Sequence, residues 1–97
     1  MGVLGSGSQR ITADGILGSS GKPLRVYNLT WLSTGTAGYV GLRNGTTTAD
    51  DLYYYKDGTA SKSYTENFGV GLLFPAGCFC DIDENVLWVV ATIEKEA

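Results

Sequence analysis

The densest set of oxygen ligands in the chain lies in the acidic stretch at residues 81–85. Residues two apart on a strand share a face, so Asp81 and Asp83 would lie together and could hold Ca²⁺ with Glu84 nearby. The spacing is not that of an EF-hand loop, and turn chemistry accounts for Asp83-Glu84-Asn85 without a metal. We therefore expect neither a metal site nor a cofactor.

The chain has no histidine, and this excludes the commonest forms of acid–base and nucleophilic catalysis, which depend on that side chain. Histidine is the usual general base, a frequent metal ligand and the partner of nucleophilic serine and cysteine. Asp50, Asp51 and Asp57 could in principle act as an acid and base pair, but nothing places them around a cleft, and Asp57-Gly58 reads as a turn. We expect no enzymatic activity.

The two cysteines lie two residues apart, in Cys78-Phe79-Cys80. On a strand this spacing puts their Cα atoms about 6.5 Å apart, near the upper limit for a disulfide. There is no second pair to complete a zinc site. We expect both thiols to be reduced and to pack as small buried hydrophobes, in a reducing compartment.

Aromatic residues are the richest chemical feature, and three of them form the run Tyr53-Tyr54-Tyr55. Strand alternation predicts that Tyr53 and Tyr55 point one way and Tyr54 the other. One face belongs to the core, and the other could be an exposed platform. Three interpretations stay open: a core-and-edge role, a protein interface, and sugar stacking.

Composition narrows the possible classes of protein. The 97 residues fit one domain. The net charge of −3 argues against nucleic-acid binding, which needs a basic surface. The longest apolar runs, near residues 69–74 and 86–93, are far shorter than the roughly 20 residues of a membrane helix. The N-terminus shows no secretory signal pattern, and we expect no membrane partner.

Glycine, serine and threonine make up about a third of the chain and cluster between apolar stretches. Turn dipeptides such as Asp14-Gly15 and Asn44-Gly45 separate short strands, among them Leu24–Ser33 and Cys78–Ile82. Seven to nine antiparallel strands at a spacing of about 8 to 12 residues predict one small all-β sandwich with essentially no helix. We favour a jelly-roll-like sandwich, although pattern alone does not separate it from immunoglobulin-like connectivity.

The two ends of this domain carry further expectations. Residues 1–8 are rich in glycine and serine and predict a flexible N-terminal arm, which leaves residues 9–97 as the sandwich domain. In the stretch of residues 66–74, Phe68, Val70, Leu72 and Phe74 alternate and should share one side of a strand. Gly69 and Gly71, on the opposite face, should leave room for close backbone approach.

Three stretches together carry a family resemblance: residues 21–27 leading into a strand with Trp31, residues 42–46, and residues 71–77 before the acidic turn and final apolar strand. They resemble the small all-β accessory virion proteins of tailed bacteriophages, that is, head decoration (cement) proteins and related head or tail components. The resemblance covers about residues 8 to 93. It does not explain the Cys78 and Cys80 pair.

The resemblance implies a non-enzymatic structural protein that binds and stabilises the capsid, as a homotrimer on the virion surface, assembled in the cytoplasm of the bacterial host. Its partners would be the major capsid protein or other virion subunits. Our candidates for the interface are Val3 and Leu4 in the arm, and Tyr53 and Tyr55. The alternative is a carbohydrate- or receptor-binding module of a phage tail or head fibre, using exposed tyrosine and the acidic turn with Ca²⁺.

Overall fold

The computed structural model describes residues 3–96, with side chains for residues 7–95. The described chain folds into eight strands and contains no helix. The strands are β1 (Val3–Ile11), β2 (Gly15–Leu17), β3 (Leu24–Ser33), β4 (Tyr39–Asn44), β5 (Asp51–Asp57), β6 (Ser63–Phe74), β7 (Cys78–Ile82) and β8 (Val86–Glu96).

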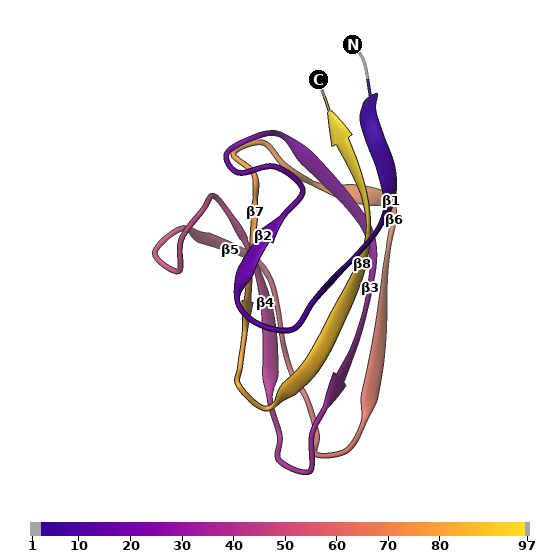
Figure 1. Cartoon of the computed structure of the whole chain (residues 1–97), viewed down its shortest axis with the longest axis vertical. Helices are drawn as coiled ribbons and strands as arrows, with labels where there is room; N and C mark the ends of the chain where they lie inside the picture. The colour runs from indigo at the N-terminus through magenta and orange to yellow at the C-terminus, as the bar shows by residue number, and fades with distance from the viewer. Residues whose placement is uncertain (1–2, 97) are drawn as a thin grey trace.

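The strands form two four-stranded sheets that pack face to face (Figure 1). Sheet A has the order β1-β8-β3-β6, and sheet B has the order β2-β7-β4-β5. Every pair of neighbouring strands is antiparallel. The result is a two-layer sandwich with the apolar side chains of both sheets between the layers.

The order of the strands identifies the connectivity. The pairs β1–β8, β2–β7, β3–β6 and β4–β5 are those of one long antiparallel hairpin. Rolling that hairpin up brings β8 beside β3 and β7 beside β4, which are the two remaining pairs. This is the eight-stranded jelly roll, so the predicted fold class is confirmed.

The core lies where inward-facing residues of the two sheets meet. Leu29 and Trp31 of β3, Leu42 of β4 and Val89 of β8 are fully buried there. The inward positions of short β7 are Cys78, Cys80 and Ile82, and both cysteines are free, buried thiols, as predicted. The complete buried apolar set is Leu17, Leu24, Val26, Leu29, Trp31, Val40, Leu42, Phe74, Cys78, Cys80, Ile82, Val86, Val89, Ala91 and Ile93.

The N-terminal segment differs from the expected arm. From Val3 onward its backbone belongs to β1 and pairs with β8, from Val3 opposite Glu96 to Ile11 opposite Val89. Glycine and serine have low strand propensity, but β8 presents a row of backbone donors and acceptors that pair regardless of side chain. The side chains of Val3 and Leu4 lie outside the described ones, so their interface role stays a prediction.

One side chain of β1 joins the two sheets. The Nε2 of Gln9 donates to the carbonyl of Ile16 in β2 at 3.0 Å, and its Oε1 accepts from the backbone N–H of Gly18 at 2.8 Å. These bonds imitate a rung of a strand ladder between β1 and β2. Gln9 thus closes the side of the sandwich on which β1 and β2 are the edge strands.

Strand β6 departs from the predicted alternation. Between the pairs Asn28–Asn67 and Val26–Leu72, four residues of β6 lie opposite a single residue of β3. This bulge turns Val70 outward, so that 88% of its surface is exposed, and the prediction that it shares one side with Phe68, Leu72 and Phe74 is wrong.

Two glycines make the bulge possible. Gly69 has φ +64° and Gly71 has φ +100°, both in the region that favours glycine. A Cβ on Gly71 would come within 2.5 Å of Cγ of Arg25, so the predicted close approach is confirmed there. Gly69 faces open space and is required for its backbone angle alone.

Candidate functional site

The outer surface of sheet B, which we call the sheet B face, is built from rows of side chains that run across its strands. Residues paired across antiparallel strands project from the same face. The first row crosses all four strands, from Ile16 to Phe79, Arg43 and Leu52. Three of these four side chains are apolar, and Leu52 is 43% exposed.

A second row joins Asp81, Gly41 and Tyr55, and a third joins Tyr39 and Asp57. Gly41 has no side chain to interrupt the surface. Neighbouring side chains cover it instead: Cδ1 of Leu52 and Cδ1 of Tyr55 would lie 3.0 and 3.5 Å from a Cβ placed there. The sheet B face therefore combines apolar and aromatic side chains with the charged side chains of Arg43, Asp81 and Asp57.

The two tyrosines of this face support each other. The rings of Tyr39 and Tyr55 stack with centroids 5.5 Å apart. The hydroxyl of Tyr55 donates to Oδ1 of Asp57 at 2.8 Å, and the hydroxyl of Tyr39 donates to Oδ1 of Asp81 at 3.5 Å. Each ring is therefore fixed by stacking on the other ring and by a hydrogen bond from its hydroxyl, which limits the conformational entropy of both side chains.

An ion pair holds the centre of the face. Nε of Arg43 donates to Oδ2 of Asp81 at 3.1 Å, and Nη1 of Arg43 donates to the carbonyl of Asp50 at 2.9 Å. The two side chains are 22% and 11% exposed, so the pair is more than a surface contact. Because Asp81 is bound to Arg43 and Tyr39, its carboxylate serves the fold.

Carboxylates give the face a negative environment. The pKa of Tyr55 is raised, first by its hydrogen bond to Asp57. The pKa of Tyr39 is raised by burial and then by the charges of Asp81, Asp83 and Asp14. Both shifts have the direction expected when the tyrosinate would form beside negative charge.

The outer surface of sheet A has a different composition. One of its rows joins Val90, Thr30 and Thr65, and a hydrogen bond of 3.4 Å links the hydroxyls of the two threonines. The next row joins Thr92, Asn28 and Asn67. Small polar side chains of this kind are typical of a sheet face that is exposed to water.

Exposed apolar side chains on sheet A lie away from these polar rows. Val70 and Leu73 lie on the edge strand β6, and Leu87 lies near the start of β8. The row next to Val90 and Thr30 joins Trp88 and Leu32, so half-buried apolar side chains lie on the outer surface of sheet A as well, and the sheet B face differs by its exposed Leu52 and Tyr55.

The tyrosine run is divided by a bulge. Leu42 pairs with Tyr54, but the next residue, Arg43, pairs with Leu52, so Tyr53 is the extra residue. The prediction that Tyr53 and Tyr55 share one platform is therefore wrong, because Leu52 takes the expected place of Tyr53. An interface role for either tyrosine stays a prediction.

The three tyrosines consequently have different partners. Tyr53 stacks on the core residue Phe74, with centroids 5.4 Å apart. Tyr54 meets Phe68 edge to face at 5.3 Å, on the inner side of the sandwich. Tyr55 alone belongs to the sheet B face.

Sequence reasoning missed two members of the face, Ile16 and Phe79. Each lies next to a buried inward residue, Ile16 beside Leu17 and Phe79 between Cys78 and Cys80. A short strand that is apolar on both faces signals that both of its faces are covered, and this signal was available in β2 and β7.

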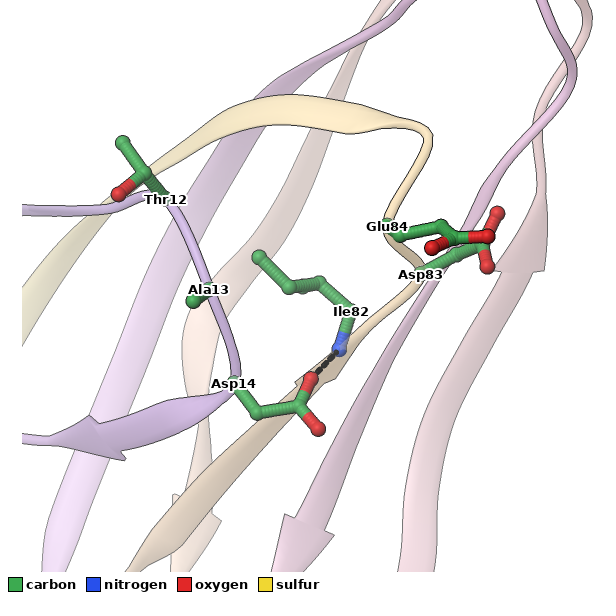
Figure 2. A pocket seen from close by; sticks show the side chains of 6 residues that line it. All are labelled: Thr12, Ala13, Asp14, Ile82, Asp83 and Glu84. Carbon is green, nitrogen blue, oxygen red and sulfur yellow. Dashed lines mark hydrogen bonds between the residues drawn. The ribbon is translucent and has the colours of Figure 1, made fainter.

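A pocket lies at one end of this sheet, between the β1–β2 loop and the β7–β8 turn. It is lined by Thr12, Ala13, Asp14, Ile82, Asp83 and Glu84. Figure 2 shows Asp14 and Ile82 joined across it: Oδ1 of Asp14 accepts the backbone N–H of Ile82 at 2.7 Å.

Two of the three acidic side chains of the pocket, Asp14 and Asp83, therefore have structural partners. Asp83 accepts a hydrogen bond of 3.1 Å from the side-chain amide of Asn85, which is ordinary turn chemistry. Among the side chains of residues 7–95, no three His, Cys, Asp or Glu are gathered closely enough to hold a metal ion together.

The cysteine thiols are poor nucleophiles in this environment. Burial raises the pKa of Cys78 to about 12, and burial raises that of Cys80 as well. A thiol reacts and binds metals as the thiolate, so these two side chains remain protonated at neutral pH.

Comparison with protein-family models, with curated proteins and with solved structures gives no match. In addition, the part of the chain that the structure describes has no helix of the length and apolar character needed to cross a membrane. The function is therefore inferred from the surfaces described above.

Proposed function

We propose that this chain is a non-enzymatic structural protein of a tailed-bacteriophage virion, which binds and stabilises the shell of the head as a decoration protein. The sheet B face is the observation that carries the proposal. Antiparallel sheets at a protein surface normally alternate apolar and polar residues, and a contiguous exposed apolar face marks a place where another protein binds.

The face suits binding without chemistry because its side chains are already ordered. Stacked tyrosine rings and the Arg43–Asp81 pair hold the surface in one arrangement. Less side-chain entropy is then lost on docking, which strengthens a contact of modest area.

A decoration protein stabilises its target by mass action. A chain that binds the assembled shell and not the separated subunits shifts the equilibrium toward the shell by RT ln(1 + [L]/Kd). The proposal includes a homotrimer, since three linked faces raise the effective concentration of each contact. It places assembly in the cytoplasm of the bacterial host, with the major capsid protein as partner.

The fold agrees with this proposal at the level of analogy. Eight-stranded jelly rolls occur in viral capsid domains and in lectins. Because one fold hosts many functions, the surface and not the topology supports the choice.

The test is the composition of purified particles. Mass spectrometry of virions from infected cells should find the chain in a fixed ratio to the major shell subunit. The variant Leu52→Ala/Tyr55→Ala should lose occupancy, while the matched variant Thr30→Ala/Thr65→Ala on sheet A keeps it. Absence of the chain from particles, or equal occupancy of both variants, would contradict the proposal.

A second candidate function, carbohydrate binding, is favoured by the pairing of Tyr55 with Asp57. The half-exposed ring can stack on a sugar, and the carboxylate beside it can accept hydrogen bonds from the hydroxyl groups of the sugar. Binding on a glycan array that disappears with Tyr55→Ala would support it. Loss of that binding with a chelator would indicate that it depends on Ca²⁺ held at the acidic turn.

A further inference from the structure

The charges of the chain are distributed unequally between the two sheets. The strands of sheet A carry three acidic and three basic residues and are balanced. The remaining seven acidic and four basic residues lie on the strands of sheet B and in the loops. The whole net charge of −3 therefore belongs to sheet B and the loops.

The acidic residues border the sheet B face. Asp57 lies on its edge strand β5, next to Tyr55. Asp14, Asp83 and Glu84 lie at the end where the β1–β2 loop meets the β7–β8 turn. The apolar and aromatic side chains of the face, around the half-buried Arg43–Asp81 pair, therefore have an acidic border, and a polar border is usual at a protein interface.

The basic residues on the strands of sheet B do not neutralise this border. Arg43 is paired with Asp81. Lys56 pairs across the sheet with buried Val40, and so projects to the inner side. Its Nζ lies 5.3 Å from the ring centroid of Tyr64 on sheet A.

We infer that the sheet B face docks a basic protein surface, in which apolar groups meet the apolar and aromatic side chains of the face and lysine or arginine side chains meet its acidic border. The inference rests on the proposed function, because it names the partner for the same face. Charge complementarity of this kind accelerates association and excludes acidic surfaces.

A second copy of the chain fits this face poorly. A symmetric pair of sheet B faces would oppose two acidic borders, and like charges in contact are repulsive. The area is also small: the nine strand positions of the three rows cover roughly 300 Å², against roughly 800 Å² per partner in a stable interface. One such contact is weak, so the partner surface must be repeated, as in an array of subunits.

The inference is tested with two synthetic probes of equal length. One peptide alternates lysine with valine and phenylalanine, and the other carries glutamate in place of each lysine. With ¹⁵N-labelled protein, the lysine peptide should shift the amide signals of Gly41, Leu52 and Phe79 and leave those of Thr30 and Thr65 unchanged. The glutamate peptide should shift none of them.

Salt and charge variants sharpen the result. Raising the salt from about 50 to 300 mM should weaken the lysine peptide about three- to tenfold, because the contacts are at a solvated border. Asp57→Asn should weaken it about two- to fivefold while keeping an acceptor for Tyr55. The matched variant Glu94→Gln on sheet A should not change the affinity.

Several outcomes would overturn the inference: equal shifts with both peptides, no shifts, or shifts on sheet A. Salt-resistant self-association that Tyr55→Ala abolishes, seen by sedimentation, would assign the face to a second copy. Glycan binding at Tyr55 would assign it to a carbohydrate.

The same variants separate this inference from the proposed function. If the chain loads onto particles but loading is insensitive to salt and to Asp57→Asn, the basic partner is wrong and the decoration role stands. If the lysine peptide binds as expected and the chain is absent from particles, the decoration role is wrong and the charge preference stands.

Discussion

Alkaline pH should unfold this protein through its two buried thiols. The pKa of Cys78 is raised by burial from 9.0 to about 12, and that of Cys80 is raised well above 9.0. Above pH 9 the unfolded chain loses these protons and the folded chain keeps them. The stabilising contribution is therefore complete below pH 9 and is lost as the pH rises toward the folded pKa.

The size of the effect follows from linkage. The Cys78 thiol lowers the free energy of unfolding by about 1 kcal/mol between pH 9 and 10, and by about 3 kcal/mol in total by pH 11. Cys80 adds a loss of the same sign. The loss from Cys78 alone is a large fraction of the whole stability of many small domains, about 5 to 15 kcal/mol.

Urea unfolding at pH 7 to 11 in the presence of a reductant measures this loss, with the fluorescence of fully buried Trp31 as the signal. Tyrosines in the unfolded chain ionise near pH 10, and the raised pKa of Tyr39 and of Tyr55 adds a loss of the same sign, so the control must remove the thiols alone. The control is the variant Cys78→Ala/Cys80→Ala, which should be less stable at pH 7 yet lose at least about 1 kcal/mol less between pH 9 and 10. Equal pH dependence of the two proteins would show that the thiols ionise in the folded state and would refute the reasoning.

Three further predictions concern the fold around the candidate site. Gly71→Ala should destabilise the protein by about 2 to 3 kcal/mol in urea unfolding, because it combines a clash with a positive φ, whereas Gly69→Ala should cost only about 1 kcal/mol. Arg43→Met should cost about 2 to 4 kcal/mol by leaving Asp81 unpaired, and the double variant Arg43→Met/Asp81→Asn should recover part of the loss; no recovery would mean that the ion pair is not the cause. Gln9→Ala should cost about 1 to 2 kcal/mol and speed hydrogen exchange of the β2 and loop amides next to it, and unchanged exchange there would exclude its role as a link between the sheets.

Strand positions were predictable because the signals for them are local. Leu24–Ser33 and Cys78–Ile82 were expected and observed with the same bounds, since period-two alternation and turn residues delimit them. The inward, reduced state of Cys78 and Cys80 followed from the same alternation.

Predictions failed where a bulge interrupts that alternation. Tyr53 is the extra residue of the β4–β5 ladder, and Val70 lies in the bulge of β6. A bulge is a property of two paired strands, because it depends on which residues of one strand lie opposite which residues of the other. The sequence of a single strand does not specify that pairing.

The amino-acid sequence by itself determined the type of the elements and limited their number to between seven and nine. It also determined the absence of histidine chemistry and a net charge of −3. Only the tertiary structure decided which strands became neighbours, and with them the apolar rows from Ile16 to Leu52 and the acidic border of the sheet B face. The physical reason is that alternation and turns act between adjacent residues, whereas a face is assembled by pairing strands that lie far apart along the chain.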